Sequence, residues 1–355
     1  MNEFIVEKAM LTDVGRKRPH NEDYIGHFEP AGPEVLAESG RLYIVADGVG
    51  GGAAGEVASE YAVRKVLYEY YRAIEPDLGK RLKAAVWAAN ADLYDHVEQH
   101  PELNRMGTTL VAAVVHGDRL IICNVGDSRA YLIRNDDIHQ VTRDHSLVAR
   151  LVEEGSITPE EAETHPRRNV VLRSLGANAK VYSDIFDGRV QLGDQIVLCS
   201  DGLTRHVTDD EILGAVSRTR ADRAVKQLVE IANVRGGQDN ISVVLLRVTE
   251  ALSLQTLAGR LAGRGAPAEP EFDDLHDAAT RQQRSAPATG QPLWPWLAPL
   301  AALSGVVGLF VLATVLAVGL ENPTWMPALA AGVILLLLGL FGALLAVLFI
   351  RRQRC

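Results

Sequence analysis

Short apolar runs, separated by Gly, Asp, Asn and Pro, recur along residues 1–250 of the chain. Runs of about four to eight residues that are rich in Val, Ile and Leu are typical of β-strands. The sequence predicts strands at Arg41–Ala46, Thr109–His116, Arg119–Val125, Ala130–Arg134, Gln195–Cys199 and Ile241–Val248.

Longer segments place apolar residues three or four positions apart, which puts them on one face of a helix. Pro159 marks the start of one short helix, because proline is favoured in the first helical turn. The other predicted helices are Ala53–Ile74, Gly79–His100, Ser146–Glu154, Asp209–Ser217 and Ala221–Val234.

The segment Gly126-Asp127-Ser128-Arg129, between two predicted strands, has the composition of a hairpin turn. Hairpins outnumber clear strand–helix–strand crossovers in this pattern. The sequence therefore predicts an α+β fold of antiparallel sheets covered by helices, rather than a doubly wound parallel sheet.

Composition and charge argue against several classes of function. The formal net charge is -9, which argues against a nucleic-acid partner because binding to the phosphate backbone needs a cationic surface. Cys123 and Cys199 lie inside apolar runs, and no cysteine spacing suggests a zinc site or a disulfide framework. A reducing compartment fits these cysteines, and the N-terminal residues lack the pattern of a secretory signal.

The character of the chain changes after residue 250. Residues 251–293 are dominated by Ala, Pro, Gly, Gln and charged residues, which predicts a flexible linker. Two uncharged apolar stretches follow, Leu297–Leu320 and Pro327–Ile350. Each has about 24 residues, more than the ~20 that cross a bilayer, and neither has the polar face expected of a buried core helix.

Residues 294–355 are therefore predicted to form a transmembrane helical hairpin. Arg281 and Arg284 precede the first span, and Arg351, Arg352 and Arg354 follow the second, whereas the connecting turn has no positive charge. Positive flanks favour the cytoplasmic side of a membrane. We expect a multi-pass protein with two spans that tether a cytoplasmic domain, residues 1–250, to the lipid bilayer.

Five acidic residues recur in one kind of place, and at least three of them lie where a predicted strand begins or ends beside glycine: Asp23, Asp47, Asp127, Asp201 and Asp239. Any one of these acids, taken alone, is explained by a turn, in which aspartate is common. If the strands lie in two packed sheets, however, their ends can converge on one cleft, and clustered carboxylates are tolerated chiefly when cations hold them. Oxygen ligands select hard ions such as Mg²⁺ or Mn²⁺, and the lack of a His or Cys cluster disfavours zinc.

The glycine-rich loop from Gly48 to Ala53 suggests an alternative to a metal site, namely a dinucleotide-binding site. It satisfies a loose G-x-G-x-x-[GA] pattern after a strand and before a helix, as in dinucleotide-binding oxidoreductases. Asp47 directly before the loop would repel a pyrophosphate, and the position of the ribose-binding acid falls inside the helix Ala53–Ile74. The glycines instead allow the Gly48 carbonyl to approach a metal held by Asp47.

Several motifs together resemble one family. They occur in the order and spacing of the metal-dependent type 2C protein serine/threonine phosphatases of the bacterial type, and the resemblance covers residues 5–248. The motifs are RPHNED, VADGVGG, MGTT at Met106–Thr109, VGDSRAYLIR, LCSDGL at Leu198–Leu203, and GGQDNISVV. The resemblance implies an αββα sandwich of two antiparallel sheets flanked by helices, with a metal cleft at one end.

The resemblance also implies roles for individual acids. Asp47 matches the carboxylate that bridges two metal ions, and Gly48 matches the residue whose carbonyl contacts one of them. Asp201 and Asp239 match ligands of the second ion. Asp23 matches the acid of the N-terminal motif beside the metals.

Three further residues are implied by the same comparison. Arg18 matches the arginine that binds the substrate phosphate, a task suited to a bidentate guanidinium. Asp127 matches a ligand of a third metal ion, shared with Asp201. Asn169 stands where some relatives have a further contact to that third ion. One departure is Val49, which replaces the histidine that several members use as a proton donor.

The implied activity is hydrolysis of phosphoserine and phosphothreonine in proteins by a water that two Mn²⁺ or Mg²⁺ ions activate. The substrates would be phosphoproteins, and the membrane tether suggests opposition to a membrane Ser/Thr kinase. A catalytically silent scaffold with the same fold is an alternative, but it would be expected to lose some of Arg18, Asp47, Asp201 or Asp239, and all are present.

Overall fold

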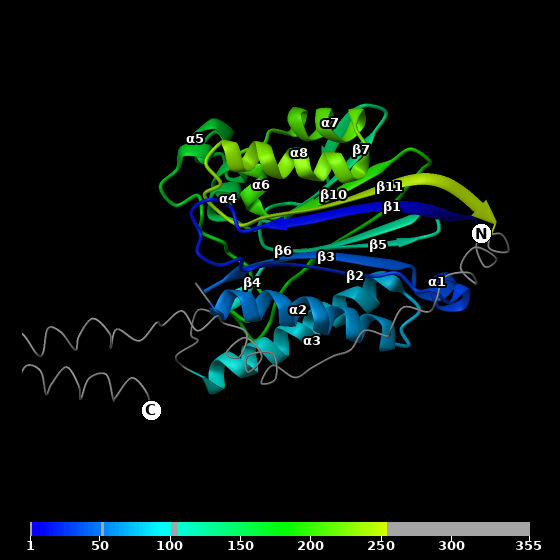
Figure 1. Ribbon diagram of the computed structural model, residues 1–355. Coiled ribbons are helices and arrows are strands. Elements are labelled where there is room, and N and C mark those ends of the chain that lie inside the picture. The colour runs from blue at the N-terminus through cyan, green and yellow to red at the C-terminus, as the bar shows by residue number, and fades with distance from the viewer. Residues whose placement is uncertain (1, 51–52, 101–105, 254–355) are drawn as a thin grey trace, which may run out of the picture. The chain divides into compact units, whose positions relative to one another are not determined.

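The structure is a computed structural model that describes residues 2–50, 53–100 and 106–253. Two antiparallel sheets lie face to face, and helices cover the outer face of each (Figure 1). The predicted α+β sandwich is therefore confirmed.

The predicted linker, apart from residues 251–253, which belong to a strand, lies outside the described residues, and so do both predicted spans. In the ranges that the structure does describe, no helix combines the length and the apolar character needed to cross a membrane.

One sheet, called sheet 1 below, has five strands in the order β1-β11-β10-β7-β8. All its neighbouring strands are antiparallel. The strands are β1 (Asn2–Asp13), β11 (Ile241–Ser253), β10 (Gln195–Cys199), β7 (Arg129–Arg134) and β8 (Asp137–Gln140).

The other sheet, sheet 2, runs in the order β2-β3-β5-β6-β9, and the two-residue strand β4 also pairs with β3. Its strands are β2 (Asp23–Phe28), β3 (Arg41–Val49), β4 (Gly107–Thr108), β5 (Leu110–His116), β6 (Arg119–Val125) and β9 (Asp184–Arg189). The strands that the apolar pattern did not predict are β4 and the four edge strands, β1, β8, β2 and β9. Edge strands expose one side and carry more polar residues, so their hydrophobic signal is weak.

The predicted hairpin at residues 126–129 is wrong. β6 pairs with β5 and β9 in sheet 2, whereas β7 pairs with β10 and β8 in sheet 1. The turn thus carries the chain from one sheet to the other. Gly126 adopts a φ of 107° there, and a Cβ at this position would lie 2.6 Å from the Thr109 side chain. Glycine supplies both the backbone conformation and the space that this crossing needs.

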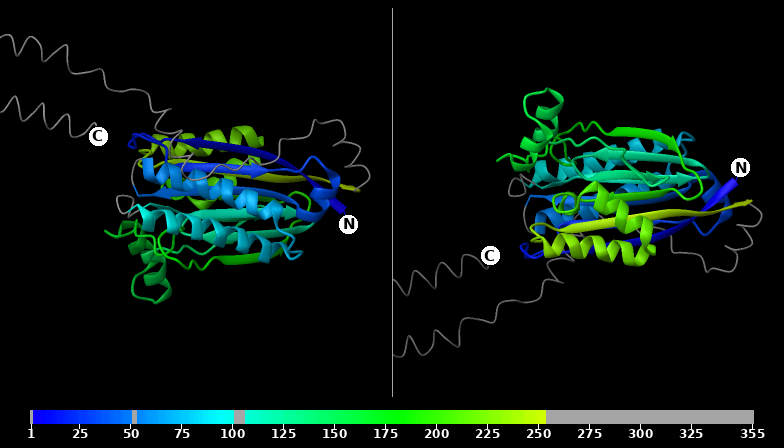
Figure 2. Two further views of the ribbon diagram at one scale, coloured as in Figure 1. Left: turned by 90° about the horizontal axis from the view of Figure 1, so that it is seen from below. Right: turned by 90° about the horizontal axis from the view of Figure 1, so that it is seen from above.

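Helices α2 and α3 cover sheet 2, and α7 and α8 cover sheet 1, as Figure 2 shows from below and above. The long predicted helices are confirmed with ends shifted by at most two residues. The helices are α1 (Pro33–Ser39), α2 (Ala53–Arg72), α3 (Leu78–Gln99), α4 (Leu147–Glu153), α5 (Pro159–Thr164), α6 (Asp201–Thr204), α7 (Asp209–Arg218) and α8 (Ala221–Val234).

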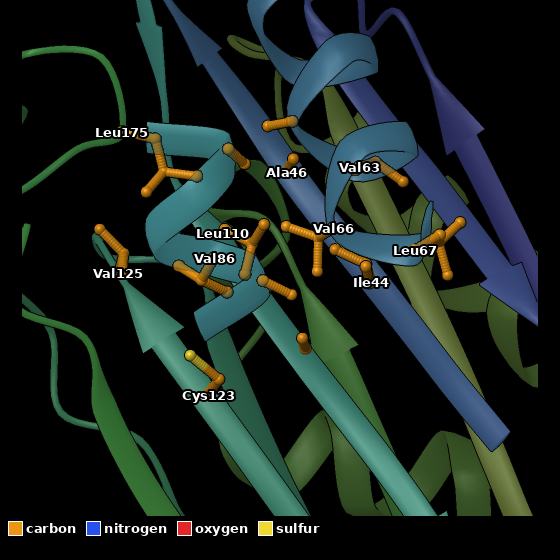
Figure 3. Packing of buried hydrophobic residues seen from close by; sticks show 14 of the residues in the cluster. Ile44, Ala46, Val63, Val66, Leu67, Val86, Leu110, Cys123, Val125 and Leu175 are labelled. Carbon is orange, nitrogen blue, oxygen red and sulfur yellow. The ribbon is translucent and has the colours of Figure 1, made fainter. Parts of the chain in front are cut away.

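The core forms three layers because successive side chains of a strand face opposite sides of the sheet. In β3, Ile44 and Ala46 pack against α2 and α3, as Figure 3 shows. Tyr43 and Val45 instead face sheet 1. The same alternation continues at the end of the strand, so that Asp47 follows Tyr43 and Val45 on the face between the sheets.

Candidate metal centre

Asp23 and Asp47 lie side by side at one end of sheet 2. They are directly paired residues at the start of β2 and near the end of β3. Paired residues of an antiparallel ladder point to the same face. Asp23 therefore shares with Asp47 the face between the sheets, where it is only 5% exposed.

Gly48 lies where two chain segments approach β3 closely. Its N–H donates to the Glu22 carbonyl at 3.0 Å. A Cβ on Gly48 would lie 2.2 Å from the carbonyl oxygen of Gly55 in α2. Only glycine fits against the first turns of this helix, and the glycine-rich sequence after Asp47 thus has a packing reason of its own.

A chain of hydroxyl groups connects Asp47 to the turn that carries Asp127. The backbone N–H of Asp47 donates to Thr109 Oγ1 at 3.1 Å, and Thr109 Oγ1 lies 2.7 Å from Ser128 Oγ. Both hydroxyls are buried. The crossing turn between the sheets thereby holds Asp127, which is 7% exposed, beside the other acids.

Asp201 and Asp239 come from sheet 1. Asp201 begins α6, one residue after the end of β10, and Asp239 precedes β11, the neighbour of β10. Gly202 allows the two segments to touch, because a Cβ there would lie 2.0 Å from the Asn240 carbonyl oxygen.

Two polar side chains join the sheets at this end. Ser200 Oγ donates to Asp23 Oδ2 at 2.7 Å. Asn240 Oδ1 accepts from the Glu22 N–H, and Asn240 Nδ2 donates to the carbonyl of His20. These bonds tie the start of β2 to the ends of β10 and β11. Ser200 and Asn240 were not predicted as site residues, although both directly adjoin predicted acids.

Burial and mutual repulsion make the acids hard to ionise together. Burial, and secondarily the charges of Asp201 and Asp239, raise the pKa of Asp23 to about 7. Burial also raises the pKa of Asp127 to about 7, with Asp201 contributing, and it raises the pKa of Asp47 well above its usual range, with Asp23 contributing. The pKa of Asp201 is raised by burial as well, although Arg205 opposes the shift.

The side chains of this cluster suit divalent cations in their chemistry, although within the described residues no three His, Cys, Asp or Glu side chains are grouped as they would be around an ion. Asp23 Oδ1 and Asp201 Oδ1 are buried and have no hydrogen-bond partner. Buried carboxylate oxygens normally have partners, and a cation satisfies them without a donor hydrogen. An all-oxygen donor set suits Mg²⁺ or Mn²⁺. The residues present therefore agree with the metal ions that the resemblance implies.

Arg18 lies at the exposed side of the cluster. Its guanidinium donates to Asp239 from Nη2 and also contacts Oδ1 from Nε, each at 3.0 Å. The Arg18 side chain is 43% exposed, so it can reach a ligand from solvent while Asp239 orients it.

Other predicted residues lie further out. Val49 ends β3 and is 37% exposed. Asn169 lies on the exposed segment after α5, and its contact to a third ion stays a prediction.

Arg205, which was not predicted, contacts both Asp201 and Asp239. Its spacing of four residues from Asp201, which starts a helix, is the sequence signal that could have revealed it.

The topology argues against the dinucleotide alternative. β3 lies between antiparallel neighbours, β2 and β5. The strand, glycine loop and helix around Gly48 are therefore not part of a parallel βαβ unit, which a dinucleotide site requires.

Comparison with known proteins shows the family to which the chain is similar. The family model described as protein phosphatase 2C matches residues 19–245. The serine/threonine phosphatase stp of Listeria innocua is 42% identical over 243 residues, which covers 66% of this chain and 93% of that protein.

Solved structures give the same result. The serine/threonine phosphatase Stp1 of Staphylococcus aureus aligns with a TM-score of 0.64 at 35% identity, covering 70% of this chain and 97% of that one. The catalytic domain of the phosphatase PstP, solved with two manganese ions, aligns with a TM-score of 0.61 at 36% identity, covering 69% and 99%.

The fold is that of the bacterial serine/threonine phosphatases with which the chain aligns. The chain belongs to the protein phosphatase 2C family and is a protein serine/threonine phosphatase of the bacterial type. The predicted family and enzyme class are thereby confirmed.

Proposed function

We propose that this phosphatase hydrolyses phosphoserine and phosphothreonine in proteins with two divalent cations, Mn²⁺ or Mg²⁺, held by Asp23, Asp47, the Gly48 carbonyl, Asp201 and Asp239. The observation that carries the proposal is that these carboxyl groups, from separate segments, lie close enough for the charges of Asp201 and Asp239 to act on Asp23 and Asp47. Two of their oxygens are buried and have no hydrogen-bond partner. The two manganese ions in the related PstP structure support the number and kind of ion.

Different residues would bind the cations and the substrate phosphate. When bound, the cations lower the pKa of water and neutralise charge on the phosphoryl oxygens. Asp47 and Asp23 hold their positions through the β2–β3 ladder, and Asp201 and Asp239 through the turns at β10 and β11. Asp239 accepts from Nε and Nη2 of the exposed Arg18, which leaves Nη1 and the second N–H of Nη2 for the substrate phosphate.

The candidate protein nucleophiles are poorly suited to attack phosphorus. Burial raises the pKa of both Cys123 and Cys199 to about 12, which keeps the thiols protonated. The Ser128 hydroxyl bonds Thr109, and the Ser200 hydroxyl bonds Asp23. These contacts favour direct attack by water over a covalent intermediate. The Val49 side chain has no proton to donate, so we assign protonation of the leaving group to solvent.

We further propose that the enzyme acts at the cytoplasmic face of a membrane and opposes a Ser/Thr kinase there. The support is the pair of long apolar stretches at 297–320 and 327–350, with arginines on both flanks. Membranes from cells that express the full chain should retain the protein through an alkaline carbonate wash. Release of the protein into the wash would refute the tether.

Asp47→Asn tests the catalytic proposal. The variant should lose Mn²⁺-dependent hydrolysis of a phosphothreonine peptide, because it removes a negative charge that would hold the cations. Asp95→Asn, an exposed change on α3, is the matched control and should keep full activity. Activity of Asp47→Asn equal to the control, or wild-type activity that survives EDTA, would refute the mechanism.

A further inference from the structure

His145 lies beside the turn that carries the chain from sheet 2 to sheet 1, and it is only 7% exposed. It exchanges two hydrogen bonds with Gly126 in that turn. The Gly126 N–H donates to His145 Nδ1 at 3.1 Å, and the His145 N–H donates to the Gly126 carbonyl at 2.9 Å. A backbone N–H can only donate, so Nδ1 is the acceptor, the imidazole is neutral and its proton is on Nε2.

The proton on Nε2 is directed to Asp184, the first residue of β9. Nε2 lies 3.2 Å from Asp184 Oδ2, and Arg173 Nη1 donates to Oδ1 of the same carboxylate at 3.2 Å. A carboxylate bonded to one ring nitrogen fixes both the tautomer and the orientation of a histidine. The two nitrogens of His145 thus join different parts of the chain.

The backbone of His145 lies at the neck of a largely exposed segment, residues 146–171, which contains α4 and α5. Ser146 and Val171 form an isolated β-bridge across this neck. The N–H of Leu172 donates to the His145 carbonyl at 2.7 Å. The chain therefore leaves and returns beside His145, and the contacts of Nε2 brace the same neck.

The turn that Nδ1 holds leads on to Asp47. Ser128 Oγ in this turn lies 2.7 Å from Thr109 Oγ1, which accepts from the Asp47 N–H at 3.1 Å. A Cβ on Gly126 would lie 2.6 Å from the Thr109 side chain, so the turn packs directly against this threonine. A turn that moved away from His145 would withdraw this support from Asp47.

We propose that His145 is a positioning residue for hydrolysis at Asp47. Its Nδ1 holds the crossing turn against Thr109 and so fixes the backbone of Asp47, whereas its Nε2 braces the neck of the 146–171 segment through Asp184. The inference deepens the proposed two-metal function and rests on it.

Two amide variants separate the roles of the two nitrogens. In His145→Asn, the side-chain oxygen can still accept from the Gly126 N–H, but the side chain is too short to reach Asp184. In His145→Gln, the side-chain nitrogen can reach Asp184, but no acceptor remains beside Gly126. His116→Asn is the matched control, because His116 Nε2 contacts the Ala37 carbonyl at the other end of β5.

Kinetics would use the full-length chain in detergent with saturating Mn²⁺ and a phosphothreonine peptide. His145→Gln should lower kcat roughly tenfold, as is usual when the support of a metal ligand is lost. Its KM should not change, because Arg18 remains in place. His145→Asn and the control should keep the wild-type kcat.

Hydrogen–deuterium exchange in EDTA, resolved by residue, supplies a readout that does not depend on activity. Exchange of the Gly126 amide should accelerate in His145→Gln only, and exchange of the Leu172 amide should accelerate in His145→Asn only. Acceleration of both amides to the same extent in both variants would overturn the division between the two nitrogens.

The kinetic outcomes separate this inference from the proposed function. If wild type is active and His145→Gln keeps its kcat, or if both variants lose kcat equally, the positioning role is overturned and the phosphatase mechanism stands. If wild type shows no Mn²⁺-dependent hydrolysis, both are overturned.

Ser128→Ala covers the case in which His145→Gln does not fold, because it is a smaller change on the same route to Asp47. It should also lower kcat without changing KM. A kcat equal to that of wild type would overturn the route from His145 through the turn.

Discussion

Replacing Asp23 by Asn should remove a large pH dependence from the stability of the metal-free protein. Asn keeps the shape of the side chain, and its carbonyl can still accept from Ser200 Oγ, as Asp23 Oδ2 does. Unlike the carboxyl group, the amide stays neutral at every pH. The variant therefore mimics protonated Asp23.

The size of the effect follows from the pKa. Burial raises the pKa of Asp23 from 3.8 to about 7 in the folded chain. A shift of this size corresponds to about 4 kcal/mol. Because the folded-state pKa lies above the unfolded one, the wild type has its full stability below about pH 4 and loses it as the pH rises through 7. The stability of wild type relative to Asp23→Asn should therefore fall by about 4 kcal/mol over this range.

The assay is chemical unfolding in EDTA at several pH values from 4.5 to 8, followed by far-ultraviolet circular dichroism. Saturating Mn²⁺ should shrink the difference between the proteins at high pH or reverse its sign, because a cation favours the ionised carboxylate. If the free energies of unfolding of wild type and Asp23→Asn in EDTA differ by the same amount at every pH, the Asp23 carboxyl group is not held in a buried site beside other negative charges.

Other changes test the packing and the substrate site. Gly202→Ala should destabilise the fold by about 3 kcal/mol, since its Cβ would lie 2.0 Å from the Asn240 carbonyl oxygen. The control is Gly214→Ala in α7, where a Cβ would meet no atom within 4 Å beyond the chain neighbours and the backbone of its own helix, and it should stabilise the fold by about 0.5 kcal/mol in thermal unfolding. Thr208→Ala should cost about 1 kcal/mol in the same assay, because it removes the capping box of α7. Arg18→Lys should raise KM for a phosphothreonine peptide roughly tenfold, since it replaces a fork with a single point charge; an unchanged KM would remove Arg18 from the phosphate site.

Buried strands and long helices could be predicted from the sequence because each carries its own periodic signal. β5 and β6 contact a helix layer on one face and the opposite sheet on the other. Both faces are therefore apolar, and each strand is visible in the sequence as a short continuous apolar run. The edge strand β9, with the sequence DIFDGR, lacks such a signal and is defined by its pairing with β6.

Asp47, Asp127, Asp201 and Asp239 could be found because each lies beside a recognisable strand, whereas Asp23, which starts the unpredicted strand β2, was found only through the motif RPHNED. How these acids are arranged in space could not be predicted. The turn at Gly126 has the local composition of a hairpin whether it returns to the same sheet or crosses to the other one. Only the pairing of β7 with β10 decides this, and that pairing is a property of the whole fold. Arg205 escaped prediction for a related reason. Its significance depends on its contact with Asp239, which is distant in sequence.

Diffraction from a crystal grown with Mn²⁺ tests the central claim most directly, because anomalous scattering locates manganese independently of any assumed ligands. The account predicts two anomalous peaks in the cluster, with carboxylate oxygens of Asp47, Asp201 and Asp239 within bonding distance. The absence of any peak there, with these side chains turned away from one another, would contradict it.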